Sequence, residues 1–183
     1  MSAKADPPDS GPQLTLIPFR PEHGPGVTSW VRSIDEASRW ASLDHLPTLE
    51  DLGHWHGQSF ATPFVLISGN HVVGYGELWD DREEDREKGE AELARLVIEP
   101  ARRGRGLGRA LTRALAEEAW RRGFTEVWLR VVADNLPARR AYEAAGFVRA
   151  TPEEEAAFNA GQPRAYVWMR TQAGCVTQGS GTG

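Results

Sequence analysis

The sequence of 183 residues is poor in several features that each mark a particular class of protein. It has a single cysteine, Cys175, so no disulfide can form within the chain and no cysteine-rich zinc site can be built. No apolar run approaches the roughly 18 residues of a membrane-spanning helix, and the first twelve residues lack the apolar stretch of a signal peptide. The net charge is -5, whereas nucleic-acid-binding domains usually carry an excess of basic residues. We therefore expect a cytoplasmic protein that binds neither a membrane nor nucleic acid.

The histidines do not form a metal-binding pattern either. His54 and His56 stand two residues apart in a region with a helical pattern, so they point to different sides of a helix. No cysteine or clear carboxylate completes a ligand set with them. We predict that the protein holds no metal.

The sequence has the composition of a globular domain, with 40% hydrophobic and 26% charged residues. We expect one domain over residues 13–172, between disordered tails at 1–12 and 173–183. The expected strands are 14–19, 63–67, 71–79, 91–100, 125–133, 147–150 and 163–170, and the expected helices are 107–122, 135–145 and 151–158, with two or three short ones in 27–60. Because strands and helices alternate after residue 90, the expected fold class is α/β, a mixed sheet with helices on both faces.

A segment rich in glycine and arginine precedes one of these helices. In "ARRGRGLGRALTRAL", residues 101–115, the glycines Gly104, Gly106 and Gly108 occupy every second position. Glycine lets another molecule approach the backbone closely, and free N–H groups at the start of a helix attract anions. The segment therefore indicates a phosphate-binding site, and the alternative is a glycine-rich turn whose arginines are only solvated.

Two well-known phosphate loops do not fit this segment. The P-loop requires Gly-Lys-Ser/Thr, whereas Gly108 is followed by Arg109 and Ala110. The dinucleotide fingerprint Gly-x-Gly-x-x-Gly, started at Gly104, requires glycine at the position of Arg109. Neither pattern therefore explains the glycines.

The spacing Arg103-x-x-Gly106-x-Gly108, between a strand and a helix, resembles the acetyl-CoA signature (Arg/Gln)-x-x-Gly-x-(Gly/Ala) of GNAT-type N-acetyltransferases. The strand "LVIEP" before it and the segment "VWLRVVADNLPARRAYEAAGF", residues 127–147, are also similar to that family. The resemblance runs from about residue 63 to 150. It implies the GNAT fold, a mixed, mostly antiparallel sheet of six to seven strands with a splayed V between the fourth and fifth. It also implies acceptor-side helices at 27–60 and an acetyl-CoA-binding core at 62–150.

The resemblance implies acetyl-CoA as the co-substrate. In the family, backbone N–H groups of the glycine loop bind the pyrophosphate, and the pantetheine arm lies along the preceding strand like an added strand. Asn135 matches a position that often contacts pantetheine, although it equally suits a helix cap. The implied coenzyme A site comprises Leu96, Val97, Ile98, Arg103, Gly104, Arg105, Gly106, Leu107, Gly108, Arg109, Asn135 and Tyr142.

Amide formation requires a neutral amine, a group that takes its proton and a group that protonates the leaving thiolate. Tyr142 matches the family position whose hydroxyl faces the coenzyme sulfur as general acid, and otherwise it is a packed helix tyrosine. Glu92, eleven residues before Arg103, matches a glutamate that some members use as general base, here through a water. Glu77 is a second candidate, and a paired or solvated surface role is the alternative for both. Arg130 stands where other members carry their catalytic glutamate, which excludes that arrangement here.

The acceptor is expected to be a primary amine of a small molecule, which attacks directly in a ternary complex, or else a peptide N-terminus. Trp30, Glu77 and Trp79 are candidate substrate-binding residues, although at least half of the first four tryptophans are expected in the core. The acidic segment 80–90 forms either a rim that attracts cationic amines or a solvated hairpin tip. The alternatives in function are an alanine-type protein N-terminal or aminoglycoside acetyltransferase, and a non-catalytic acyl-CoA sensor. We expect a monomer or a homodimer.

Overall fold

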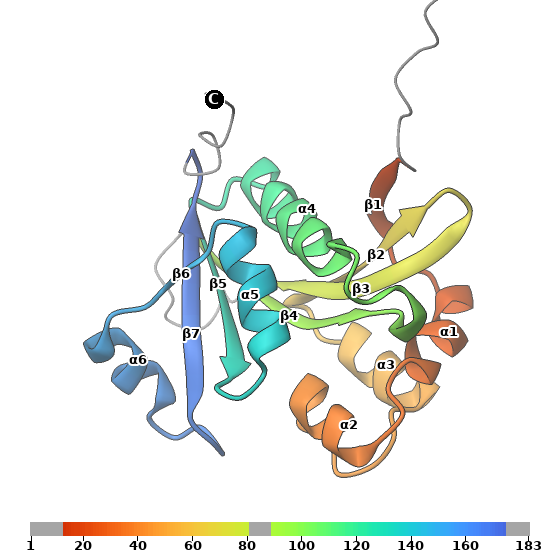
Figure 1. Ribbon diagram of the computed structural model, residues 1–183, viewed down its shortest axis with the longest axis horizontal. Coiled ribbons are helices and arrows are strands. Elements are labelled where there is room, and N and C mark those ends of the chain that lie inside the picture. Colours follow the sequence, from red (N-terminus) through yellow and green to blue (C-terminus); the bar gives the residue numbers. More distant parts are fainter. Residues whose placement is uncertain (1–12, 81–88, 175–183) are drawn as a thin grey trace, which may run out of the picture.

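The computed structural model describes residues 13–80 and 89–174, so the expected N-terminal tail, most of the C-terminal tail and most of the acidic segment lie outside the described residues. At its centre is one seven-stranded sheet in the order β1-β2-β3-β4-β5-β7-β6 (Figure 1). Only β4 and β5 pair parallel, which confirms the mixed, mostly antiparallel sheet. The strands are β1 (Leu14–Pro18), β2 (Ala61–Ser68), β3 (His71–Trp79), β4 (Glu90–Ile98), β5 (Glu126–Val132), β6 (Val148–Arg149) and β7 (Tyr166–Gln172).

Helices cover both faces of the sheet, with α4 and α5 on one face and α1, α2, α3 and α6 on the other (Figure 1). None of the helices in the described part of the chain is long and apolar enough to cross a membrane. The helices are α1 (Gly24–Ser29), α2 (Ile34–Ala41), α3 (Leu49–His56), α4 (Leu107–Arg121), α5 (Leu136–Ala144) and α6 (Pro152–Asn159).

The two faces of the sheet have separate cores, because successive side chains of a strand point to opposite sides. On the first face, Leu93 and Leu129 pack with Leu115 of α4. On the second face, Tyr75 of β3 packs with Leu52 of α3. A smaller cluster on the second face consists of Trp128, Trp168 and Phe158 of α6. Helices α4 and α5 thus cover the first face of the sheet. On the second face, the middle strands lie between α3 and α6.

Local signals explain where several helices begin. Capping boxes start α3 and α6, with Thr48 opposite Asp51 and Thr151 opposite Glu154. Asn135 caps α5, a role that the sequence also suggested for it. The first of the short helices is the exception, because α1 begins at Gly24, before the expected region 27–60.

Both ends of β4 differ from the expected strand 91–100. The strand begins at Glu90, inside the segment expected as a loop, because Glu90 pairs with Glu126 of β5. It ends at Ile98, because the following proline starts a short 3-10 helix, Pro100–Arg102.

The last strand also lies later than expected, since β7 spans Tyr166–Gln172 and not 163–170. The side-chain amide of Asn159 explains the shift. Its Oδ1 accepts from the backbone N of Tyr166 at 2.9 Å and its Nδ2 donates to the backbone O of Tyr166 at 2.9 Å. These two bonds tie the end of α6 to the start of β7, and the residues between them form the connection.

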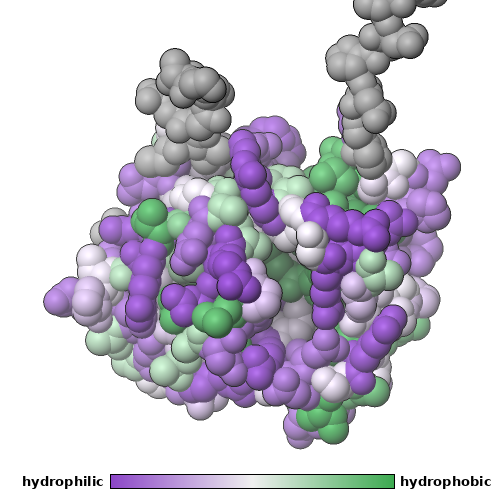
Figure 2. Space-filling model, viewed as in Figure 1, coloured by the Kyte–Doolittle hydropathy of each residue, from purple (hydrophilic) through white to green (hydrophobic). Residues whose placement is uncertain are grey.

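The splayed V between the fourth and fifth strands is confirmed. The parallel ladder between β4 and β5 joins only Glu90–Leu93 to Glu126–Leu129. Beyond it β4 stays paired with β3 as far as Ile98, while β5 stays paired with β7 as far as Val132. The two halves of the sheet therefore diverge after Leu93. Figure 2 shows a hollow on the first face of the sheet, between α5, β4 and the start of α4. The floor of this hollow is less hydrophilic than its rim.

Candidate active site

The glycine loop presents uncovered backbone at the start of α4. Gly104 and Gly106 both have φ of +78°, the left-handed region that other residues adopt only under strain. A Cβ built on either glycine would have no neighbouring atom within 4 Å. The first N–H groups of α4 have no acceptor within the helix, and the helix dipole adds positive charge there. The loop therefore has the chemistry of an anion site, as the sequence predicts.

Arginine side chains surround this loop. Arg105 and Arg109 are exposed beside it. Arg103, the arginine of the signature, donates through Nε to the backbone O of Ile98 at 3.2 Å and through Nη1 to Glu36 of α2 at 3.0 Å. Arg103 thus joins the end of β4, the loop and α2, while the other two arginines contribute positive potential at the surface.

The hollow between the diverging strands adjoins the loop. Its β4 side is formed by the segment 96–98, beyond the last contact of β4 with β5. Its other side is α5, which packs closely on the start of α4: a Cβ at Gly108 would stand 3.3 Å from that of Ala141. The third glycine of the loop therefore serves helix packing, and it brings α5 beside the proposed phosphate site.

Tyr142 follows Ala141 on α5 and is partly buried against the core. Burial raises the pKa of Tyr142 to about 12. Its hydroxyl has no hydrogen-bond partner among residues 13–80 and 89–174. The side chain is thus a protonated donor at neutral pH, free to act on a ligand. Asn135, also expected to bind coenzyme A, has its Oδ1 in use as the cap of α5, accepting from the backbone N of Ala138 at 3.3 Å.

Glu92 lies on β4 and is 2% exposed. Its Oε1 stands 3.2 Å from Nε of Arg130 on the neighbouring strand β5. Arg130 in turn donates to Gln162 at 3.1 Å and lies 5.4 Å from the ring centres of both Tyr166 and Trp168. Arg130 on β5 therefore forms an ion pair with Glu92 on β4.

Glu77 lies on β3 and is fully buried. Its carboxylate accepts three hydrogen bonds, from the hydroxyl of Tyr75 at 2.5 Å, from Nε1 of Trp79 at 2.7 Å and from Nη1 of Arg95 at 2.6 Å. His56 of α3 extends the network, with Nε2 2.9 Å from the Tyr75 hydroxyl. The carboxylate is thus held by three donors and closed off from solvent.

The early tryptophans divide evenly between core and surface. Trp30 and Trp55 are buried among the helices of the second face, whereas Trp40 and Trp79 are half-buried. Trp30 therefore lies away from solvent, and Trp79 lies at the middle strands with Arg95 and Arg130 near its ring. The described residues contain no group of three or more His, Cys, Asp and Glu placed to hold a metal ion.

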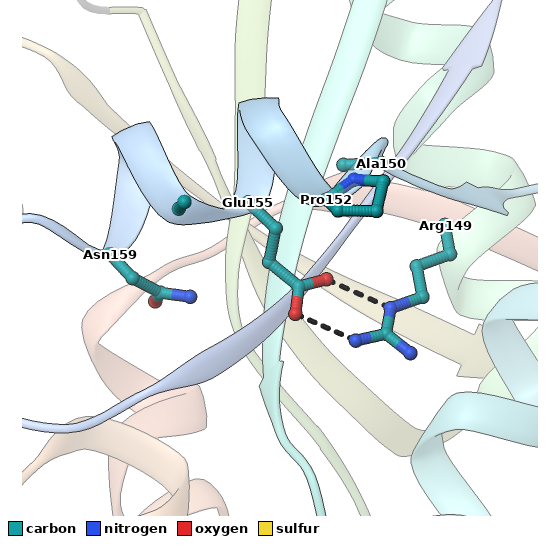
Figure 3. Close-up of a pocket in the computed structure, with 6 residues that line it drawn as sticks. Arg149, Ala150, Pro152, Glu155 and Asn159 are labelled. Carbon is teal, nitrogen blue, oxygen red and sulfur yellow. Dashed lines mark hydrogen bonds and ion pairs between the residues drawn. The ribbon is translucent and has the colours of Figure 1, made fainter.

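A hollow of about 420 Å³ on α6 lies apart from this region. Its charged residues, Arg149 and Glu155, are bonded to each other by two hydrogen bonds of 2.8 and 2.7 Å (Figure 3). Asn159, at its other end, holds the start of β7. The hollow therefore offers no unpaired acid or base for chemistry.

The structure brings the glycine loop, the segment 96–98 and α5 with Tyr142 around one hollow, and places Glu92 and Trp79 on the opposite face of the sheet. Sequence reasoning missed Arg95 as part of the site. The signal was present, because Arg95 is a charged residue inside the otherwise apolar run "LARLVI". Its partner could not be inferred, because Glu77 reaches it only through the pairing of β3 with β4.

The model of the Acetyltransferase (GNAT) family matches residues 28–147, about two thirds of the chain. The chain belongs to the GNAT acetyltransferase family. The matched range holds the glycine loop, the diverging strands and Tyr142.

Curated relatives include enzymes with different acceptors. The [ribosomal protein bS18]-alanine N-acetyltransferase of Escherichia coli strain K12 is 42% identical over 62 residues, 34% of this chain and 42% of that protein. The aminoglycoside N(6')-acetyltransferase type 1 of Klebsiella pneumoniae is 26% identical over 79% of this chain and 80% of that protein. The mycothiol acetyltransferase of Kineococcus radiotolerans is 34% identical over 80% of this chain and 46% of that protein. The chain therefore spans less than half the length of two of these three relatives.

Solved GNAT structures share the fold. The aminoglycoside acetyltransferase AAC(6')-Ib in complex with coenzyme A and kanamycin has a TM-score of 0.67 at 23% identity, over 88% of this chain and 95% of that one. The spermidine N-acetyltransferase of Vibrio cholerae in complex with coenzyme A and spermine has a TM-score of 0.69 at 18% identity, over 91% and 99%. At these identities the likeness establishes the GNAT fold of the chain and leaves its acceptor open.

Proposed function

We propose that the protein is an N-acetyltransferase that transfers the acetyl group of acetyl-CoA to a primary amine. The observation that carries the proposal is the position of the glycine loop. Two left-handed glycines begin α4 at the mouth of the hollow where β4 leaves β5. A pyrophosphate on the loop places the pantetheine arm in the hollow, where backbone groups of residues 96–98 no longer pair with β5.

In the proposed reaction the neutral amine attacks the thioester carbonyl carbon in a ternary complex. A C–N bond forms and the C–S bond breaks, so the amine must lose a proton and the leaving thiolate must gain one. Tyr142 supplies the second proton, because its hydroxyl is protonated at neutral pH and makes no bond to the described residues. The single cysteine, Cys175, lies beyond the family-matched range 28–147, so no thiol there carries the acyl group.

Glu92 is the proposed acceptor of the amine proton, through a water. It lies on β4 one residue before the last contact with β5, on the face of the sheet that holds Trp79. Glu77 is fully buried and bound by three donors, so we assign it no proton transfer. The amine therefore approaches between α3 and α6, on the face opposite the coenzyme phosphates.

We propose a small molecule as the acceptor. The aminoglycoside enzyme of Klebsiella pneumoniae is a relative that matches across most of both chains. A peptide N-terminus is a second candidate, because the bS18-alanine enzyme has the higher identity over its shorter match. The two are distinguished by the acceptors that the protein acetylates.

Steady-state assays of coenzyme A release with a panel of amines test the proposed activity. The panel contains aminoglycosides, polyamines, amino sugars, amino acid amides and a peptide with an N-terminal alanine. We expect turnover with at least one small amine and saturation with acetyl-CoA. Binding of coenzyme A without turnover of any amine would favour the non-catalytic sensor, and failure to bind coenzyme A would contradict the proposal altogether.

Substitution of Glu92 and Arg130, singly and together, tests the role of the buried pair. Glu92→Gln removes the carboxylate beside the partly exposed guanidinium of Arg130, which keeps its bond to Gln162, and is expected to lower the free energy of unfolding by about 2 kcal/mol. The double variant Glu92→Gln/Arg130→Gln is expected to lose less than the sum of the single variants, because neither charge remains. Urea denaturation of the four proteins measures this coupling.

The pH dependence of the same variants tests Glu92 as the base. Without the neighbouring cation a carboxylate binds a proton at higher pH. Arg130→Gln is therefore expected to move the acid limb of kcat/KM to higher pH, and Glu92→Gln to abolish that limb. An acid limb that persists in Glu92→Gln would assign the proton transfer to another group.

A further inference from the structure

A bulge interrupts β4 directly after its last contact with β5. Opposite Gly76 of β3, β4 carries two residues, because Tyr75 pairs with Val97 while Glu77 pairs with Ala94. These two residues are Arg95 and Leu96. A bulge of this kind bends its strand and increases the local twist. It therefore marks the point where β4 turns away from β5 and the hollow opens.

The residue at the bend is unexpected for its backbone conformation. Arg95 has φ of +50°, in the left-handed region where a side chain costs free energy and glycine does not. Glycine is common in this sequence, with 19 residues, and it occupies the left-handed positions of the cofactor loop. An arginine at a position suited to glycine indicates that its side-chain contacts stabilise the bend by more free energy than the strained backbone costs.

The contacts of Arg95 identify that stabilisation. Nη1 donates to the buried carboxylate of Glu77 at 2.6 Å. The guanidinium lies 4.1 Å from the ring centre of Trp55 and 4.9 Å from that of Trp79, within the range of cation–π attraction. The backbone O of Arg95 accepts from Nε1 of Trp40 at 2.7 Å. The bend is thus held through its side chain by β3 and α3 and through its carbonyl by α2.

Glu77 is in turn fixed by its surroundings. The hydroxyl of Tyr75 and the indole N–H of Trp79 orient the carboxylate toward Arg95. Burial, together with the adjacent charge of Glu77, raises the pKa of Tyr75, so its hydroxyl remains a donor. The carboxylate of Glu77 cannot rotate toward a different cation, because Tyr75 and Glu77 are both fully buried. The pair is a rigid connection between β3 and the bend of β4.

We propose that Arg95 and Glu77 are positioning residues that hold the bulge of β4 in the shape that binds the pantetheine arm of coenzyme A. The inference rests on the proposed function, since it assigns the pair to the arm and not to the phosphates. Loss of the pair lets the bend relax toward a regular strand that continues along β5. The segment 96–98 then no longer offers its backbone to a ligand, while the glycine loop, on the other side of residue 98, is unaffected.

The test compares two ligands by isothermal titration calorimetry, coenzyme A and adenosine 3'-phosphate 5'-diphosphate, which keeps the phosphates and lacks the arm. In the variants Arg95→Ala, which keeps the backbone strain and removes the side-chain contacts, and Glu77→Gln, the Kd of coenzyme A is expected to rise about 10-fold, the loss of about one backbone hydrogen bond or two. The Kd of the fragment is expected to stay within about twofold of the wild-type value. A merely structural defect lowers the number of binding sites and leaves both Kd values unchanged.

Two further variants keep the test open if these fold poorly. Arg95→Lys retains the charge and is expected to restore part of the coenzyme A affinity. Trp40→Phe removes the bond to the carbonyl of Arg95, keeps an aromatic ring beside Trp55 and Tyr75, and is expected to weaken coenzyme A binding by about threefold. Glu155→Gln is the matched control, because it breaks the exposed ion pair with Arg149 on α6 (Figure 3) and should change neither Kd.

The outcomes separate this inference from the proposed function. Wild-type protein that binds both ligands, with variants that lose affinity for coenzyme A alone, supports the assignment. Variants that bind coenzyme A as the wild type does, or that lose both ligands to the same extent, overturn it and leave the acetyltransferase proposal standing. Wild-type protein that does not bind coenzyme A overturns both.

Discussion

Replacing Gly106 by alanine is expected to weaken coenzyme A binding about 10- to 100-fold, equivalent to one hydrogen bond to a charged phosphate. Gly106 has φ of +78° as the residue before α4, where alanine is strained by about 1–2 kcal/mol. The new methyl group would extend into the open space that the ligand is proposed to occupy. The loop must then shift, and backbone N–H groups that face the pyrophosphate lose their alignment. Calorimetric titration of coenzyme A at fixed salt concentration measures the effect.

Gly123 at the other end of the same helix is the matched control. Its φ is +92° and a Cβ there would also meet nothing within 4 Å. It lies about 20 Å from the glycine loop along α4. Gly123→Ala is expected to lower the free energy of unfolding by about 1 kcal/mol, as Gly106→Ala does, without changing the Kd of coenzyme A. Equal losses of affinity in the two variants would place the phosphate site elsewhere.

The parts of the fold that local signals determine were predictable. Gly123 after an apolar stripe ends α4, and Asn135 before a proline begins α5. The glycines of the loop were predictable as a site because their spacing is itself the chemical requirement for exposed backbone. The V came from the family resemblance and not from the residues, and the order of the strands was not predicted, because local patterns do not determine which strands become neighbours.

The parts that depend on pairing across the sheet were not predictable. The ion pair of Glu92 with Arg130 exists because β4 and β5 run parallel in one register. Burial of Glu77 likewise depends on Arg95, which the bulge turns toward it. The sequence offered both Glu92 and Glu77 as candidate bases, because it does not show that Arg130 and Arg95 lie beside them. The start of β7 was missed for a different reason, since it depends on the backbone N of Tyr166 donating to Oδ1 of Asn159 at the end of α6.

Replacing Tyr142 by phenylalanine is expected to lower kcat about 100-fold or more, the usual contribution of a positioned general acid. The phenyl ring keeps the packing of Tyr142 against the core, so the Kd of coenzyme A is expected to stay within about threefold of the wild-type value. The hydroxyl makes no bond to the described residues, so its loss leaves none of their polar groups without a partner. A large loss of kcat with unchanged binding and unchanged melting temperature assigns the hydroxyl to the chemical step. An unchanged kcat would show Tyr142 to be only a packed helix tyrosine.

The pH dependence provides a second, independent test of this role. Burial raises the pKa of Tyr142 to about 12, whereas an exposed tyrosine titrates near 10. At pH 10 an exposed tyrosine is about half ionised, while Tyr142 remains largely protonated. The wild-type kcat is therefore expected to show no fall between pH 8 and 10 from loss of the acid.

In Tyr142→Phe the remaining rate depends on water as the donor, and faster release of better leaving groups should partly restore it. The test uses acetyl thioesters on the same adenosine and pantetheine framework whose thiols are more acidic than that of coenzyme A. With these substrates the variant is expected to lose less rate than with acetyl-CoA, because the leaving thiolate is a weaker base and depends less on protonation by an acid.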